Sequence, residues 1–99
     1  MLKTELIATA DMRVAEFLLK AKHSGQWHYH SEIVEYCYCL DGLIVIEQEG
    51  KQSIVLKPGE KVEIAVGNVH RVCNVGAQLS RYLVIQGVGA YDFLQVDGV

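Results

Sequence analysis

The stretch "HYHSEIVEYCYCLDG", residues 28–42, contains two of the four histidines of the chain, separated by one residue. If this stretch begins as a β-strand, His28 and His30 face one side and the aromatic residues beside them face the other, because side chains alternate along a strand. Two imidazoles on the same side of a rigid sheet can converge on a divalent metal ion, for which histidine nitrogen is a common ligand. The stretch therefore predicts part of a metal site.

Glu35 is the acidic residue that we expect to join the two histidines. It lies five positions after His30, and this odd offset would place the two side chains on opposite faces of one uninterrupted strand. The polar residues between them offer a break, so we expect a second strand to begin near Glu35 and to direct Cys37 and Cys39 inward with it. Glu32 is the rival acid, and we place it in the exposed connection, although the spacing alone leaves the exchange open.

The fourth candidate ligand lies far downstream. His70 follows the turn residues Gly67 and Asn68 and opens a segment typical of a strand, in which Val72 and Asn74 share its face. Three imidazoles and one carboxylate would hold a divalent ion and leave coordination positions for water, oxygen or substrate. Each residue alone is more simply an ordinary polar residue, but four ionisable groups inside a fold carry a desolvation cost that a metal ion removes. The candidate ligands are His28, His30, Glu35 and His70.

The rest of the chain is typical of an all-β protein. From Gln26 onward, short runs rich in β-branched and aromatic residues alternate with turn residues, which predicts six or seven strands. Residues 43–48 and 52–57 flank Gly50 at the distance of a hairpin. The predicted turns lie at residues 41–42, 49–52, 57–60 and 66–68.

Residues 12–22, "MRVAEFLLKAK", are ambiguous. Their apolar residues also fit one stripe of a helix and local propensity favours a helix, so periodicity alone leaves the choice open. We assign a strand, because a small sheet with one open face needs a covering sheet, and two packed or closed sheets are the usual solution. The expected fold class is all-β, with two antiparallel sheets.

Length and composition fit one globular domain, residues 1–99, since 51% of the residues are apolar, 21% are charged and the charges of both signs are scattered. The net charge of −3 and the lack of a Lys/Arg cluster argue against a nucleic-acid partner. No apolar run approaches the roughly 18 residues of a membrane helix, and the first residues lack the apolar core of a secretory signal. We therefore expect no membrane partner and a cytoplasmic location.

The three cysteines are most simply small buried residues in a reducing compartment. Cys37 and Cys39 would share one face of a strand with Cα atoms roughly 6.5 Å apart, which is poor disulfide geometry. Facing the cavity beside Glu35, they could also be soft ligands or redox-sensitive thiols. Cys73 is expected to point outward, and His23 to be solvated. The residues expected to line the pocket or to support the ligands are Cys37, Cys39, Asn74, Tyr82 and Gln86.

Aromatic residues are expected on the outer faces of two strands, the one that carries the histidine pair and the one that begins near Glu35. They are Trp27, Tyr29, Tyr36 and Tyr38. Water would not readily cover such a surface, so burial between subunits would explain it. Cover by the amino-terminal strands of the same chain is the other interpretation, and both stay open at this point.

Two segments resemble the motifs of the cupin superfamily. Residues 25–42 contain Gly, His-x-His, four residues, Glu, six residues and Gly, and residues 59–74 are similar to the pattern of Gly, five residues, Pro-x-Gly, two residues, His, three residues and Asn. Ala65 stands where the family usually has proline, and the opening glycine lies two residues before the histidine pair instead of five. The resemblance implies a single cupin domain over residues 1–99, folded as a jelly-roll β-barrel with a metal site inside it and commonly forming a homodimer.

The resemblance also implies a cofactor, one divalent transition metal ion (Fe, Mn, Ni, Cu or Zn), but no single reaction. Members of the superfamily include dioxygenases, isomerases, decarboxylases, sugar-binding domains and storage proteins. We expect a metal-dependent enzyme, dioxygenase-like or isomerase-like, that acts on a small organic molecule. The alternative is a non-catalytic module that binds or senses a sugar-like or carboxylate ligand, and a metal-free barrel retained for assembly ranks last.

Overall fold

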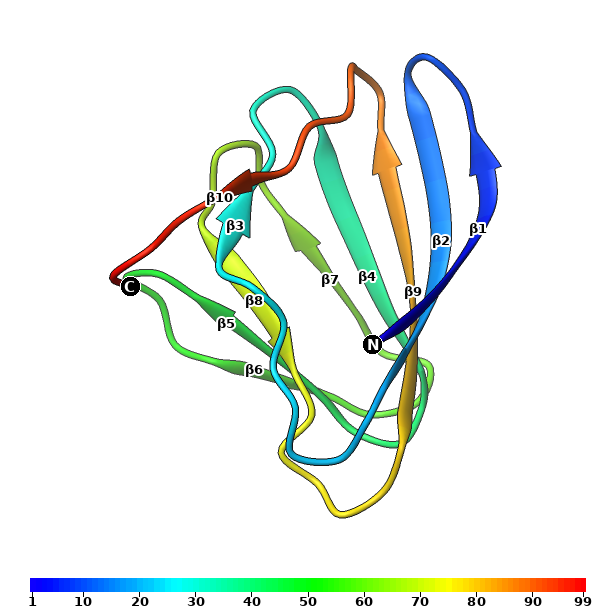
Figure 1. The fold of residues 1–99 in the computed structure, drawn as a ribbon, viewed down its shortest axis with the longest axis vertical. Coiled ribbons are helices and arrows are strands. Elements are labelled where there is room, and N and C mark those ends of the chain that lie inside the picture. Colours follow the sequence, from blue (N-terminus) through cyan, green and yellow to red (C-terminus); the bar gives the residue numbers. More distant parts are fainter.

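Ten β-strands and no helix make up the fold in a computed structural model, which describes all residues from 1 to 99. The strands form two five-stranded sheets, in the orders β1-β2-β9-β4-β7 and β10-β3-β8-β5-β6 (Figure 1). The molecule has no helix that is long and apolar enough to cross a membrane. The strand bounds are β1 Leu2–Ala8, β2 Met12–Leu19, β3 His28–Tyr29, β4 Val34–Asp41, β5 Ile44–Gln48, β6 Ile54–Leu56, β7 Lys61–Ile64, β8 His70–Cys73, β9 Ser80–Gly87 and β10 Leu94–Gln95.

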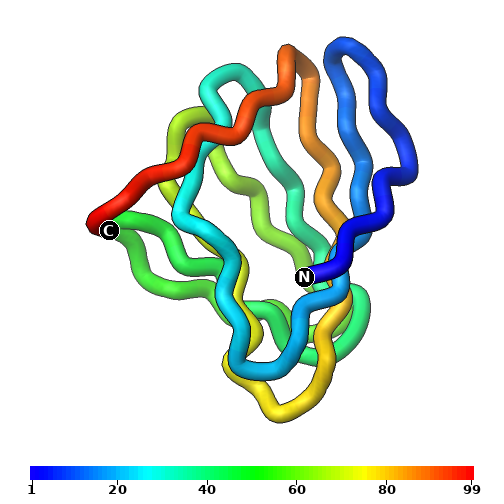
Figure 2. The backbone as a smooth tube through the Cα atoms, in the orientation of Figure 1, coloured from blue at the N-terminus to red at the C-terminus, as the bar shows by residue number.

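All strand pairs are antiparallel, and the two sheets form the two walls of one barrel. Only β1 and β2, and β5 and β6, are consecutive strands of one sheet; at every other connection the chain passes from one sheet to the other (Figure 2). This winding is that of a jelly roll, or double-stranded β-helix. The predicted fold class, all-β with two antiparallel sheets, is confirmed.

Residues 12–19 of the ambiguous segment 12–22 form strand β2, so the assignment of a strand is confirmed, although the strand ends three residues earlier. β2 pairs with β1 on one side and with β9 on the other, and it buries Ala15 and Leu19 against the facing sheet. The predicted hairpin is also present, as β5 and β6. From Gln26 onward there are eight strands rather than six or seven, because β10 consists of two residues and is too short to show a period.

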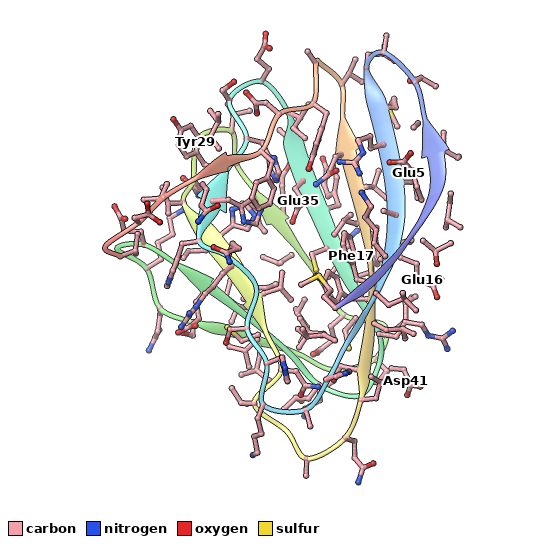
Figure 3. The ribbon with its side chains drawn as sticks, in the orientation of Figure 1. Glu5, Glu16, Phe17, Tyr29, Glu35 and Asp41 are labelled. Atoms are coloured by element: carbon pink, nitrogen blue, oxygen red, sulfur yellow. The ribbon has the colours of Figure 1, made fainter.

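The apolar core fills the space between the sheets on the side of the barrel away from the histidines. Along β4, Glu35 lies in the upper half of the molecule in this view and Asp41 lies near the lower end (Figure 3). Burial of each large aliphatic side chain contributes roughly 1.5–3 kcal/mol. The core residues are Ala15, Leu19, Cys37, Cys39, Ile44, Ile46, Leu56, Ile64, Val72, Tyr82 and Val84.

Gly42 ends the first motif at a position that only glycine suits. Its φ is +74°, and an added Cβ would lie 2.6 Å from Ser80 Oγ. The Ser80 hydroxyl donates to Leu43 O at 2.8 Å and accepts from Leu43 N at 3.1 Å, so the turn is tied to the start of β9. This close approach fixes the end of β4, the strand that carries Glu35.

Cys73 lies on the predicted face of β8 but is buried there. Its side chain lies on the face of β8 opposite Val72, but only 2% of Cys73 is exposed. Cys73 Sγ donates to Glu47 Oε1 at 2.9 Å, and the side chain of Ser24, which forms a β-bridge with Cys73, also hydrogen-bonds to this thiol. Alternation gives the face correctly, but it does not reveal a loop that covers the face.

The outer aromatic residues have partners within the chain, but not the predicted ones. The guanidinium of Arg71 lies 4.8 Å from the ring centroid of Trp27, and Tyr29 pairs with Leu94 of β10. The hydroxyl of Tyr36 donates to Glu63 at 3.0 Å. β1 and β2 extend the sheet beyond β9 instead of lying over β4, so cover by the amino-terminal strands is wrong.

Candidate metal centre

The four candidate ligands converge at one point between the sheets. Their potential ligand atoms all lie within 4.8 Å of one another. His28 in β3 lies directly opposite His70 in β8, and His30 follows β3. Glu35 reaches the cluster from β4 in the facing sheet. The structure therefore brings together residues that the sequence separates by more than forty positions.

Distances within the cluster are short, and burial is nearly complete. His30 Nε2 lies 3.1 Å from Glu35 Oε1, and His70 Nε2 lies 3.5 Å from Glu35 Oε2. The ring centroids of His28 and His70 are 4.3 Å apart. His30, Glu35 and His70 are buried, whereas His28 is half-buried and borders the cavity described below.

Each histidine ring is oriented by a backbone carbonyl at its Nδ1 atom. The carbonyl oxygens are those of Gln26 for His28 at 2.8 Å, Asp92 for His30 at 2.5 Å, and Asn68 for His70 at 2.8 Å. A carbonyl oxygen only accepts, so each Nδ1 carries the hydrogen and each Nε2 is the atom left for a metal ion. A hydrogen bond at the second ring nitrogen is the usual support of a metal-binding histidine.

The carboxylate of Glu35 is held in its ionised form. Burial alone would raise the pKa of Glu35, but the hydrogen bonds from His30 and Gln86 and the neighbouring His70 ring lower it well below its usual range. Gln86 Nε2 donates to Glu35 Oε1 at 2.6 Å, across the β9–β4 pair. Burial also opposes protonation of His30, but its hydrogen bonds to Glu35 and to the Asp92 carbonyl raise its pKa overall.

Two observations fit a cation in this cluster. His70 Nε2 is fully buried and has no hydrogen-bond partner, an arrangement that is rare for a polar atom inside a protein. His30 Nε2 and Glu35 Oε1 also lie within hydrogen-bond distance of each other, and this contact needs a proton on the ring nitrogen. A metal ion bound by these atoms would displace that proton and would give the buried nitrogen of His70 a partner. A set of three nitrogens and one carboxylate suits a first-row transition metal.

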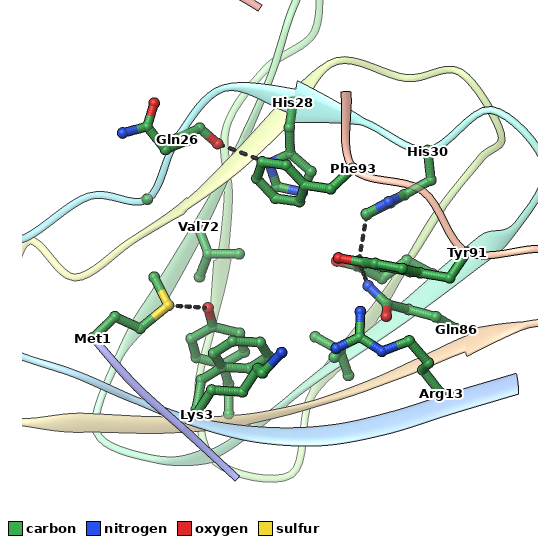
Figure 4. Close-up of a pocket in the computed structure, with 15 residues that line it drawn as sticks. Met1, Lys3, Arg13, Gln26, His28, His30, Val72, Gln86, Tyr91 and Phe93 are labelled. Atoms are coloured by element: carbon green, nitrogen blue, oxygen red, sulfur yellow. Dashed lines mark hydrogen bonds and ion pairs between the residues drawn. The ribbon is translucent and has the colours of Figure 1, made fainter. Parts of the chain in front are cut away.

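A cavity of about 360 Å³ borders the cluster. The carboxy-terminal segment covers it with two aromatic rings: the ring of Phe93 stacks on His28 at 4.1 Å and the ring centroid of Tyr91 lies 5.5 Å from that of His30 (Figure 4). Asp92, between them, accepts hydrogen bonds from the backbone N–H and the hydroxyl of Ser31. The cavity is therefore partly closed by a segment that is tied to the loop before β4.

The remaining predicted site residues divide into two groups. Tyr82 and Gln86 line the cavity. Cys37 and Cys39 do not line it, because they follow Glu35 deeper into the apolar core. Asn74 lies at the far end of β8, where its Nδ2 donates to Leu19 O at 3.0 Å and to Gln78 O at 2.7 Å. It supports the end of a strand, away from the cluster.

Several cavity residues were not among the sequence candidates. Arg13 could have been found, because it alternates with the inward residues Ala15 and Leu19 and is therefore a charged residue on an inward face. Tyr91 and Phe93 had no local indication, since they reach the histidines from about sixty positions away in the sequence. Lys3 likewise reaches the cavity only through the pairing of β1 with β2.

The chain belongs to the cupin domain family, because the family model Cupin_2 matches residues 15–86. This match includes all four members of the histidine and glutamate cluster. The protein is thus a cupin with a cluster of three histidines and one glutamate that is consistent with a metal site. No protein of curated function matches the sequence significantly.

Solved structures share the fold at low sequence identity. An uncharacterized conserved protein with a double-stranded β-helix domain from Klebsiella pneumoniae has a TM-score of 0.87 and 18% identity, covering 98% of this chain and 84% of that one. A predicted oxalate decarboxylase from Thermotoga maritima has a TM-score of 0.79 and 22% identity, with coverage of 87% and 78%. A sugar phosphate isomerase from Silicibacter pomeroyi has a TM-score of 0.75 and 17% identity, with coverage of 97% and 78%. These likenesses establish the fold alone.

Proposed function

We propose that the protein binds one divalent transition metal ion through the cluster and acts as an enzyme on a small organic molecule in the adjacent cavity. One observation carries the proposal: three ring nitrogens, each freed for a ligand by a carbonyl at the opposite nitrogen, meet one ionised carboxylate beside a cavity of about 360 Å³. The proposed ligands are His28, His30, Glu35 and His70. The donor set suits Fe, Mn, Ni, Cu or Zn.

The protein residues supply orientation and exclusion of water. Gln86 holds the plane of the Glu35 carboxylate, and the Asp92 carbonyl holds the ring of His30. The rings of Tyr91 and Phe93 cover the cavity, which lowers its water content around a bound molecule. When bound, the metal supplies Lewis acidity and, if it is redox-active, electron transfer.

The reaction class that we propose is dioxygenase-like or isomerase-like. Its support is the size of the cavity, which suits a small molecule, and the use of the same fold by a predicted oxalate decarboxylase and a sugar phosphate isomerase. Oxalate and sugar phosphates, which the descriptions of those two proteins name, are small oxygen-rich molecules, and a cavity with a metal cluster at one wall fits a substrate of that kind.

The proposal is tested first by metal content. We expect about one metal ion per chain after purification without added metal, and a large loss of metal in His70→Ala, because this residue is fully buried in the cluster. His23→Ala is the matched control, since His23 is exposed and its ring bonds only to Ala21 O. Metal content that is near zero, or that is equal in all three proteins, would remove the proposed site.

Catalysis is tested separately by comparing iron-loaded and zinc-loaded protein with candidate substrates. Oxygenase chemistry requires a redox-active ion, so the zinc form should be inactive, whereas an isomerase relying on Lewis acidity should work with zinc. Equal oxygen consumption in both forms would exclude the oxygenase.

A non-catalytic binding module is the alternative, and one observation favours it. Outside the cluster, the ionisable side chains that line the cavity are Lys3, Arg13, Tyr82 and Tyr91. Burial raises the pKa of Tyr82 well above its usual value, so this hydroxyl is a poor base. A bound molecule recovered unchanged after long incubation with metal-loaded protein would support this alternative against the enzyme.

A further inference from the structure

The cavity has a second group of charged side chains, Arg13 and Lys3, in addition to the metal cluster. Figure 4 shows both residues on the wall opposite His28. Arg13 pairs with Gln86 across β2 and β9, and Gln86 pairs with Glu35 across β9 and β4. Because neighbouring strands lie about 4.8 Å apart, this row separates the backbones of Arg13 and Glu35 by roughly 10 Å. Arg13 and Glu35 are therefore close together in one sheet, and the cationic wall and the cluster border the same cavity.

Arg13 is held in place from two sides. Its Nε and Nη2 donate hydrogen bonds to the same oxygen of Glu5, Oε2, at 3.1 and 2.9 Å. Its Cζ lies 3.8 Å from the ring centroid of Tyr91. Only 11% of the Arg13 side chain is exposed, against 42% of Glu5. An inward guanidinium is costly to desolvate unless partners satisfy its donors, and Glu5 satisfies only one edge of it.

The other edge of the guanidinium is available to a ligand. Nη1 and the second hydrogen of Nη2 have no hydrogen-bond partner in the protein, which uses only Nε and one Nη2 hydrogen. Two parallel N–H donors of this kind match the paired oxygens of a carboxylate or a phosphate group. Arg13 is thus oriented and only partly neutralised.

The other charged side chains that line the cavity also favour an anionic ligand. Lys3 brings a second positive charge to the same wall, opposite Phe17 in the β1–β2 pair. The one acidic side chain that lines the cavity is Glu35, and it is already bound by His30 and Gln86. A cavity whose free charges are positive concentrates small anions.

We infer that Arg13 and Lys3 form an anion-binding subsite, which holds the carboxylate or phosphate group of a small ligand whose other end reaches the metal cluster. The inference deepens the proposed function. The contact of the ligand with the metal rests on that proposed function, whereas the binding of its anionic group rests on Arg13 and Lys3 alone. The ligand is a short organic chain with an oxyanion at one end, and the cavity of about 360 Å³ accommodates such a molecule.

The test is calorimetric titration of the intact, metal-loaded protein with malonate, inorganic phosphate and the neutral diamide malonamide. A charge-assisted contact from Arg13 corresponds to a change in Kd of roughly 10- to 100-fold. Arg13→Gln should weaken binding of the preferred anion by this factor and leave the metal content unchanged. Arg13→Lys should recover part of the affinity, because it keeps the charge but not the paired donors. Arg81→Gln is the matched control, since Arg81 is exposed on β9 and pairs with Glu16 outside the cavity.

A preference for malonate identifies a carboxylate ligand and a preference for phosphate identifies a phosphate ligand, and each supports the subsite if it depends on Arg13. The inference is overturned if neither anion binds, if Arg13→Gln binds as tightly as the wild type, or if malonamide binds as tightly as malonate. If Arg13→Gln does not unfold cooperatively, Lys3→Gln takes its place, and an unchanged Kd then overturns the inference. The two proposals can fail separately. If elemental analysis finds no metal but the metal-free protein binds phosphate and Arg13→Gln weakens this binding, the subsite is supported although the proposed function is not.

Discussion

Replacing Gln86 by leucine removes one hydrogen bond from the carboxylate of Glu35 and leaves the backbone pairing of β9 in place. Gln86 Nε2 donates to Glu35 Oε1 at 2.6 Å, and both side chains are buried. A hydrogen bond to a charged group contributes roughly 1.5–3 kcal/mol, so the metal-free variant should lose about this much free energy of unfolding. In a domain of this size each kcal/mol lowers the Tm by about 4–8 °C.

The same substitution should weaken metal binding. Groups that orient a metal ligand typically change the affinity by roughly 10- to 100-fold, and Gln86 fixes the plane of the one carboxylate in the cluster. The assay is competition for the metal against a chelating dye, together with thermal unfolding of the metal-free protein. Gln95→Leu is the matched control, because Gln95 is exposed in β10 and its side chain bonds only to Asp97, at 3.4 Å. Equal metal affinity of Gln86→Leu and the wild type would refute the role given to Gln86.

Burial lowers the pKa of His28 to about 4, so an NMR titration of the metal-free protein should find this ring neutral at pH 6, and a midpoint near 6.5 would contradict the structure. Because the unfolded chain then binds the proton more tightly, the contribution of His28 to stability falls as the pH drops from about 6.5 to about 4. Gly42→Ala should lower the free energy of unfolding by more than about 1 kcal/mol, since φ is +74° and the Cβ would lie 2.6 Å from Ser80 Oγ; an unchanged urea midpoint would count against this. Burial raises the pKa of the Cys37 and Cys39 thiols, so a thiol reagent at pH 7 should label neither residue before unfolding, and rapid labelling of the folded protein would show that they are accessible.

Alternation along short strands predicts the convergence of the four candidate ligands. It places His28 and His30 on one face. The break between β3 and β4 allows Glu35 to point toward them, which its odd offset from His30 would prevent in one continuous strand. The choice between the two acids follows the prediction as well, because Glu32 is exposed in the connection. His70 opens β8 directly opposite His28, so the facing of two distant motifs follows from the register of one strand pair.

Depth along a strand and contacts from distant segments are harder to predict. The alternation that directs Glu35 inward also directs Cys37 and Cys39 inward, but it does not show where the cavity ends and the core begins. Tyr91 and Phe93 reach the histidines by a segment with little regular structure, so no period marks them. The homodimer and the cytoplasmic location stay predictions of the sequence.

An anomalous-difference map from crystals of the protein purified without added metal tests the central claim most directly. The account predicts one peak, at roughly 2.0–2.2 Å from the three Nε2 atoms and from one oxygen of Glu35. The energy at which the anomalous signal rises would also identify the element. A peak bound by other residues, or no peak in crystals soaked with iron, manganese and zinc in turn, would contradict the account.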